Sequence, residues 1–110
     1  MIMNKKEIVE KFKKRKKELY DLYSEKFDIW IKNNYNTINE EIEDSINYGR
    51  NWFILSLRWN IFLEKHPILS QMEIIKDVVI DYFKKIDMST PEFEDNNYGF
   101  YVTVKFCNKD

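Results

Sequence analysis

The basic residues near the N-terminus carry the clearest chemical signal in this sequence of 110 residues. Positions 13–17 are all lysine or arginine, and the candidate contact residues are Lys11, Lys13, Lys14, Arg15, Lys16 and Lys17. Ammonium and guanidinium groups pair with phosphate or carboxylate groups, so this run predicts contact with nucleic acid or with an acidic protein surface. A solvated helix end that only aids solubility explains the same residues and stays open as an alternative.

Acidic side chains form three further clusters. They are Glu40, Glu41, Glu43 and Asp44; Asp87, Glu92, Glu94 and Asp95; and Glu73, Asp77 and Asp81. The last three are spaced four residues apart, so they share a helix face that could hold a divalent cation, but lysines on that face favour a solvated stripe. The first two clusters are candidate contacts for a basic groove of a protein partner, with ordinary surface charge as the alternative.

Catalytic, metal and cofactor sites are not predicted. The sequence has one histidine, His66, and one cysteine, Cys107. A structural zinc site uses four nitrogen or sulfur ligands, which these two residues cannot supply. The glycine-rich motifs that hold phosphate groups are absent as well. We therefore expect a protein without enzymatic activity and without a cofactor.

Trp52, Arg58 and Tyr101 are predicted to lie on the less apolar sides of two strands. Tryptophan, tyrosine and arginine are the residues most enriched at protein interfaces. If helices cover only the other side of the sheet, these three residues form an exposed patch for a protein partner. If the sheet is buried on both sides, they belong to the core instead.

Composition and charge limit the kind of protein. With 44% apolar and 34% charged residues the chain is typical of a globular protein, and one domain over residues 1–110 is expected. Residues 1–17 hold eight basic and two acidic side chains, a net +6, whereas the remainder holds ten basic and seventeen acidic ones, a net −7. The lack of a signal-peptide or membrane-spanning pattern and the single cysteine predict a cytoplasmic protein.

Three helices are predicted, each beginning at a short polar residue three positions before a glutamate. These capping boxes start at Asn4, Thr37 and Ser70, and the threonine and serine boxes are the stronger two. Apolar periodicity extends the helices over about 4–33, 38–47 and 71–86, and Gly49 suits the end of the second. Because the basic run at 13–17 occupies every side of a helical turn, that end of the first helix is expected to project from the core.

Two strands are predicted. Residues 98–106 alternate between apolar and polar side chains, whereas residues 50–59 fit a strand or a buried helix almost equally well. A strand is chosen for 50–59 because a lone strand at 98–106 would leave its backbone groups without partners. If the two strands are adjacent and parallel, the connection between them should be right-handed.

The expected fold is α+β, in the order α-α-β-α-β, with a long N-terminal helix and a small two-stranded sheet packed by helices. Homodimerisation that extends the sheet stays open. The expected function is a non-catalytic protein-binding module. A small phage or mobile-element inhibitor of a host defence complex, of the anti-CRISPR type, or an immunity protein fits the size, and the absence of alanine favours an A/T-rich genome. Nucleic-acid binding through the basic helix is the alternative function.

Overall fold

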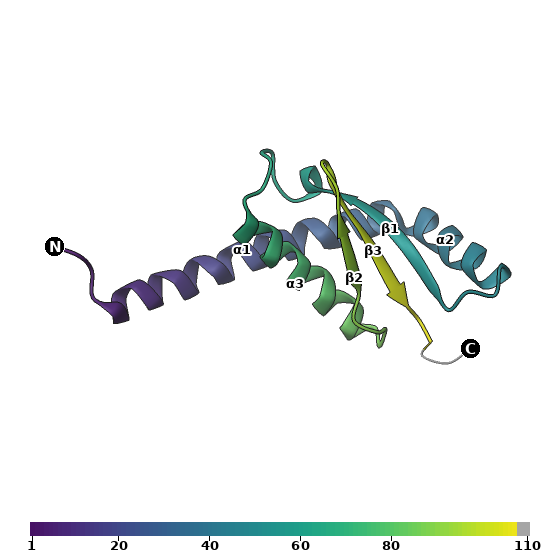
Figure 1. The fold of residues 1–110 in the computed structure, drawn as a ribbon, viewed down its shortest axis with the longest axis horizontal. Helices are drawn as coiled ribbons and strands as arrows, with labels where there is room; N and C mark the ends of the chain where they lie inside the picture. Colours follow the sequence, from purple (N-terminus) through teal and green to yellow (C-terminus); the bar gives the residue numbers. More distant parts are fainter. Residues whose placement is uncertain (108–110) are drawn as a thin grey trace.

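The chain forms three helices and a three-stranded sheet in the computed structural model, which describes residues 1–107 (Figure 1). The elements are α1 (Lys5–Asn33), α2 (Tyr35–Asn47), β1 (Trp52–Arg58), the short 3₁₀ helix η1 (Trp59–Ile61), α3 (Leu69–Lys85), β2 (Glu92–Asp95) and β3 (Gly99–Lys105). This arrangement confirms the predicted α+β fold with its long N-terminal helix. The sheet has one strand more than predicted.

The sheet has β3 at its centre, paired antiparallel with β1 on one side and with β2 on the other. In this register Leu55 lies opposite Val102, and Ser56 lies opposite Tyr101. The choice of a strand for residues 50–59 is therefore confirmed, and β1 supplies backbone partners to β3 as the prediction required. Because the neighbouring strands are antiparallel, the right-handed connection of a parallel pair does not arise.

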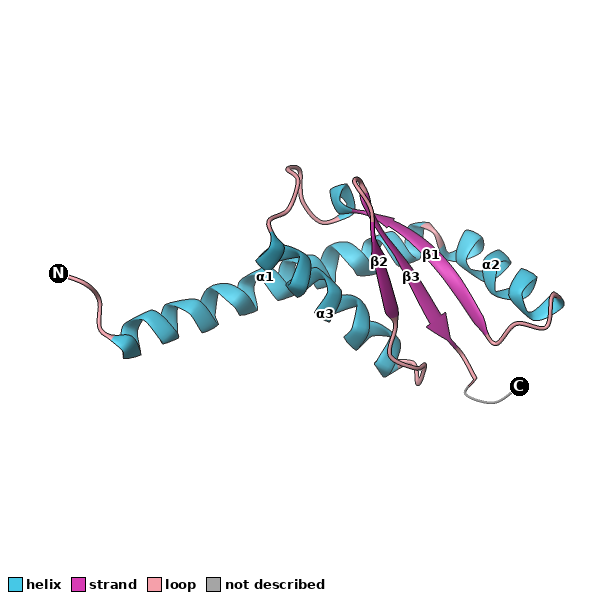
Figure 2. Cartoon of the chain, viewed as in Figure 1, coloured by secondary structure: helices cyan, strands magenta, loops and turns pink. Residues whose placement is uncertain are grey.

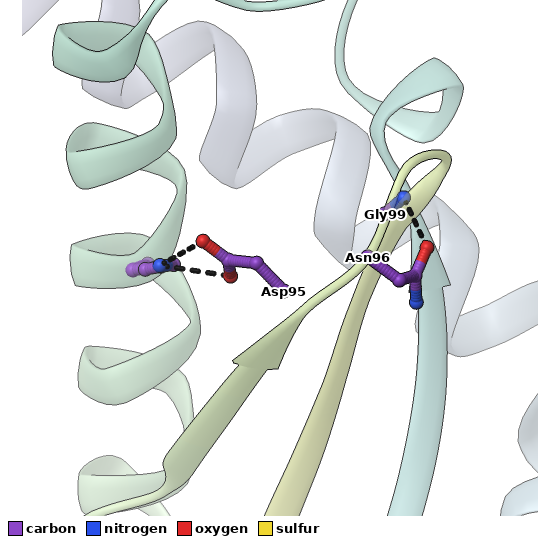
Figure 3. Close-up of polar contacts among 4 residues, drawn as sticks. Asp95, Asn96 and Gly99 are labelled. Carbon is purple, nitrogen blue, oxygen red and sulfur yellow. Dashed lines mark hydrogen bonds and ion pairs between the residues drawn. The ribbon is translucent and has the colours of Figure 1, made fainter.

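β2 is the strand that was not predicted from the sequence. Its only apolar side chain is Phe93, which lies between carboxylates, so the alternation is too short to be recognised. The strand forms because a tight turn joins it to β3, in which the side-chain oxygen of Asn96 accepts a hydrogen bond from the Gly99 amide at 2.9 Å (Figure 3). The Asp95 carboxylate also binds Nζ of Lys76 through both oxygens, at 2.9 and 3.0 Å, which ties β2 to α3.

The hydrophobic core lies between one face of the sheet and the inner sides of α1 and α3. Every second side chain of β1 and β3 enters it: Phe53, Leu55, Leu57, Phe100, Val102 and Val104. The helices contribute Tyr23 and Phe27 from α1, and Ile74, Ile75, Val78, Val79 and Phe83 from α3. Figure 2 shows α1 crossing behind the strands, with α2 beyond β1. Both long helices therefore cover the same face of the sheet.

Two predicted helix ends are confirmed. At the start of α1 the side-chain oxygen of Asn4 accepts a hydrogen bond from the Glu7 amide at 2.9 Å, which satisfies one of the amides left free at a helix start. At the end of α2, Gly49 adopts a left-handed φ of 73°, and the Arg50 amide donates to the Ser45 carbonyl at 2.8 Å. This is the hydrogen-bond pattern that glycine permits just beyond a helix.

The two capping boxes predicted to be strongest are wrong. Thr37 lies inside α2, which starts earlier, at Tyr35, because a single residue separates it from α1. Ser70 lies inside α3, where the Gln71 side chain accepts a hydrogen bond from the Ile68 amide at 3.0 Å. This hydrogen bond caps the first turn of α3 in place of the predicted serine cap. The spacing of Ser70 and Glu73 therefore did not identify where the helix begins.

The first half of α1 extends away from the rest of the chain (Figure 1), and the molecule measures 62 × 29 × 23 Å. We call residues 5–18 the arm. All of its side chains are exposed except that of Val9, which is half-buried. Ile8 and Phe12, which continue the apolar stripe of α1, are 45% and 60% exposed. The prediction that this end of the helix projects from the core is confirmed.

Candidate functional site

The candidate site is the face of the sheet that α1 and α3 leave uncovered, and we call it the open face. Its side chains alternate with those of the core along each strand. They are Trp52, Ile54, Ser56 and Arg58 from β1, Tyr101, Thr103 and Lys105 from β3, and Glu92 and Glu94 from β2. The register places them in cross-strand rows, one of which joins Ser56, Tyr101 and Glu94.

The centre of the open face is apolar and accessible. Ile54 is 39% exposed, Tyr101 is 44% exposed, and Trp52 is half-buried. An antiparallel sheet with one face in water normally carries polar side chains on that face. Exposed isoleucine and tyrosine in neighbouring rows therefore distinguish this face from an ordinary solvated one.

A groove of about 410 Å³ runs between α2 and the open face. Trp30 at the end of α1 and Ile38 of α2 form one wall, and Ile54 and Tyr101 of the sheet form the other. Glu41 of α2 also lines the groove, and it brings one carboxylate to an otherwise largely apolar surface. The helices thus add residues to this site that strand alternation alone does not reveal.

Arg58 lies at one end of the open face and shares a depression with Tyr101. Both line a second depression of about 330 Å³, beside the turn between β2 and β3. Trp52 lies toward the opposite end of β1, where Lys105 is its cross-strand neighbour. The structure therefore brings two of the three predicted interface residues into one depression and places the third on the same face farther along.

Arg50 belongs to this surface, although the sequence analysis did not single it out. Its guanidinium carbon lies 5.0 Å from the ring centroid of Trp52 and 5.3 Å from that of Tyr48. Such a cation over aromatic rings is held by attraction to the negative faces of the rings. The sequence signal for this contact was the spacing itself, since Tyr48 and Trp52 each lie two positions from Arg50.

The acidic residues of α2 have different surroundings. Glu41 lines the groove, whereas Glu40, Glu43 and Asp44 are exposed and line none of the described grooves. On the far side of the open face, Glu92 and Glu94 extend from β2. Carboxylates therefore lie on both sides of the apolar centre, toward α2 and toward β2.

The basic run lies on the arm, away from the open face (Figure 1). Within residues 1–107 only two of its cations form ion pairs, Arg15 with Glu18 at 3.3 Å and Lys17 with Asp21 at 2.8 Å. The hydrogen bond to Asp21 raises the pKa of the Lys17 ammonium. The remaining lysines of the run are exposed on the half of α1 that extends away from the rest of the chain.

The residues that bear on catalysis and metal binding are dispersed. His66 is exposed and lines a shallow depression of about 180 Å³ with Arg58 and Tyr98, away from the groove. Asp81, from the acidic stripe of α3, accepts a hydrogen bond from the Tyr20 hydroxyl at 2.6 Å. Burial and this carboxylate raise the pKa of Tyr20 to about 12. In residues 1–107, no three His, Cys, Asp or Glu side chains lie close enough to hold a metal ion.

Among residues 1–107, no helix is long and apolar enough to cross a membrane. Comparison of the chain with protein-family models, with curated proteins and with solved structures finds no match. The site must therefore be interpreted from its own residues.

Proposed function

We propose that this protein is a non-catalytic protein-binding module whose contact surface is the open face of the sheet. The observation that supports this function is the uncovered apolar centre of that face, with Ile54 and Tyr101 exposed beside the groove along α2. An exposed apolar patch with a polar rim is a typical feature of a surface that binds another protein. Trp52 and Arg58 add the residue types that dominate binding energy at interfaces.

The groove residues also support binding rather than catalysis. The lining combines aromatic, aliphatic, amide and hydroxyl side chains with the single carboxylate of Glu41. Ser56, Thr37 and Tyr101 supply the hydroxyl groups of the lining, and the Glu41 carboxylate is the one ionisable base beside them. The structure shows no hydrogen bond from the Ser56 or Thr37 hydroxyl to this carboxylate within residues 1–107. An activated nucleophile requires such a base within hydrogen-bond reach.

The acidic sides of the open face define the chemistry of the partner. Glu41 on the α2 side and Glu94 on the β2 side flank the apolar centre. A partner that matches this surface presents apolar side chains with basic residues on either side, because complementary charge steers association and fixes orientation. The narrower prediction of a phage or immunity inhibitor stays a prediction, since no feature of the open face bears on it.

A photo-crosslinking amino acid at position 54 tests the proposed function. In cells that express the protein, we expect one saturable protein adduct that untagged wild-type protein displaces. The same probe at Glu73, an exposed position on α3, is the matched control and should give no such adduct. If the partner is a different protein, competition by a Tyr101→Asp variant should fail, because its open face is altered. Equal adducts from both positions, or none from position 54, would contradict the proposed function.

Nucleic-acid binding is the second candidate, and the projecting arm is the observation that favours it. Lys11, Lys13 and Lys14 lie on a helix that stands clear of the domain and could follow a phosphate backbone. Fluorescence anisotropy with duplex and single-stranded oligonucleotides tests it between about 50 and 200 mM salt, where six phosphate contacts predict a loss of affinity of about a thousandfold. A flat salt dependence, or no binding at low salt, would exclude this candidate.

A further inference from the structure

The arm is amphipathic although nearly all of its side chains are exposed among residues 1–107. Ile8 and Phe12 are four residues apart, so they lie on one side of the helix, in line with Leu19 and then with the buried Tyr23. An apolar stripe on a surface helix normally faces a packing partner. Arg15 and Lys16 interrupt the stripe between Phe12 and Leu19, and its outer part, at Ile8 and Phe12, has no packing partner within the described chain.

Lysines flank this stripe. At about 100° per residue, Lys11 lies on one side of Ile8 and Phe12 and Lys16 on the other, and Nζ of Lys16 is 5.8 Å from the ring centroid of Phe12. Residues 1–17 carry a net +6, from eight basic and two acidic side chains. The arm therefore has an apolar centre with basic sides.

Near its centre the open face has the complementary pattern, with the apolar Ile54 and Tyr101 flanked by carboxylates at Glu41 and Glu94. Its cations Arg58 and Lys105 lie toward opposite ends of β1 and β3. We propose that the open face of one molecule binds the arm of a second copy of this chain. The inference rests on the proposed function, since it names the partner of the same face. Amphipathic helices that dock in apolar grooves are a common form of protein recognition.

The arm cannot reach the open face of its own molecule. α1 is one continuous helix, and Ile8 is separated from Trp30 at the groove by about 22 residues, or about 33 Å at 1.5 Å per residue. Figure 2 shows the arm directed away from the strands. The contact must therefore form between molecules, and a reciprocal exchange of two arms would close a twofold dimer.

A protein partner suits the arm better than a nucleic acid does. Ile8 and Phe12 lie between the lysines that a phosphate backbone would contact, and their apolar surface gains nothing from that contact. The open face, in contrast, offers Tyr101 and Ile54 for the apolar stripe and Glu41 for the lysines. The net −7 of the remaining residues also draws a +6 arm toward the body of another copy.

Sedimentation velocity of three charge variants tests the inference. The arm variant is Lys11→Glu with Lys16→Glu, beside the stripe. The face variant is Glu41→Lys with Glu94→Lys. The control is Lys6→Glu with Lys14→Glu, which makes the same charge change on the side of the arm away from Phe12. We expect wild type to self-associate in about 0.1 M salt and to dissociate in about 1 M salt, where the Debye length falls from about 10 to about 3 Å.

The arm and face variants should each associate on the order of a hundredfold more weakly than wild type, because like charges then meet. An equimolar mixture of the two should regain association, since the acidic arm of one fits the basic face of the other and the reverse contact remains native. The control should stay close to wild type. Circular dichroism and thermal unfolding of each variant show that its fold is intact.

A wild type that remains monomeric in about 0.1 M salt, or a mixture that does not recover, would overturn the inference. Equal losses in the arm variant and the control would do so too, because they would show a net-charge effect without a docked stripe. Oligonucleotide binding by a monomeric wild type would assign the arm to nucleic acid instead. The crosslinker at position 54 distinguishes this inference from the proposed function. An adduct with a different protein would support protein binding by the open face but contradict binding of a second copy. The absence of any protein adduct would contradict both.

Discussion

The two halves of α1 belong to one unbroken helix but differ in what holds them. Residues 19–33 bury Tyr23 and Phe27 to 2% and 1% exposure against α3 and η1. In residues 5–18, the arm, Val9 is half-buried and every other side chain is exposed. The helix is continuous across both halves, but the basic residues at 13–17 interrupt its apolar stripe between them.

This difference shows that helix formation and helix anchoring are set by different residues. The arm is held by local contacts, namely the Asn4 cap and the Arg15–Glu18 ion pair, each about 1 kcal/mol or less. The second half is held by tertiary packing, which provides most of the stability of helices in proteins. The arm should therefore open without unfolding the core, and substitutions in the two halves should have separate effects.

The largest expected effect comes from Phe27→Ala. The Phe27 ring is 1% exposed and lies 5.3 Å from that of Tyr82 and 6.1 Å from that of Phe62, centroid to centroid. Its truncation leaves a cavity, and the free energy of unfolding should fall by about 3–5 kcal/mol in urea denaturation. The matched variant Phe12→Ala on the arm should change it by less than about 0.5 kcal/mol. Similar losses in both would contradict the division of α1.

A smaller loss is expected from Tyr20→Phe, at the start of the anchored half. The Tyr20 hydroxyl donates to the Asp81 carboxylate at 2.6 Å and joins α1 to α3. Removal of this hydrogen bond to a charged acceptor should lower the free energy of unfolding by about 1–2 kcal/mol. Tyr101→Phe, on the open face, is the control and should cost less than about 0.5 kcal/mol. An unchanged stability in Tyr20→Phe would show that the two helices do not depend on this bond.

The same tyrosine predicts a loss of stability at high pH. Burial and the Asp81 carboxylate raise the pKa of Tyr20 from 10.0 to about 12, and burial also raises the pKa of Tyr23 and Tyr82. Above pH 10 the unfolded chain loses these protons first, so the folded state binds more protons and stability falls as pH rises toward 12. Thermal unfolding from pH 8 to pH 11.5 should show this decline, and Tyr20→Phe should decline less steeply. A parallel decline in the variant would refute the assignment to Tyr20.

The elements with long apolar patterns could be predicted from the sequence. α1, β1 and β3 lie within about two residues of their expected bounds, because each repeats its pattern over seven residues or more. β2 could not be predicted, since Phe93 is its only apolar residue and it forms through the Asn96 turn and the Asp95–Lys76 ion pair. α2 begins early because only Asn34 separates it from α1, and α3 begins where the Gln71 side chain caps its first turn. Neither start follows the predicted capping boxes.

The candidate site could be predicted only in part for the same reason. Strand alternation placed Trp52, Arg58 and Tyr101 on one side of the sheet, as the register shows. The groove also needs Trp30 and Glu41, which α1 and α2 bring to the sheet through tertiary packing. A local sequence pattern cannot show that residues from α1, α2 and the sheet lie together. The sequence could therefore indicate the open face but not the groove beside it.

The smallest expected effect is that of Asn4→Ala, and it should be confined to the arm. The Asn4 side chain satisfies the Glu7 amide at 2.9 Å, and loss of such a cap costs a helix about 1 kcal/mol. Because the arm opens independently of the core, amide hydrogen exchange over residues 5–14 should become about fivefold faster, while exchange at Val78 and Val102 and the midpoint of thermal unfolding stay unchanged. A drop in the unfolding midpoint comparable to that of Tyr20→Phe would mean that the arm and the core unfold as one unit. In that case the apolar stripe of the arm would already contribute to the stability of its own molecule.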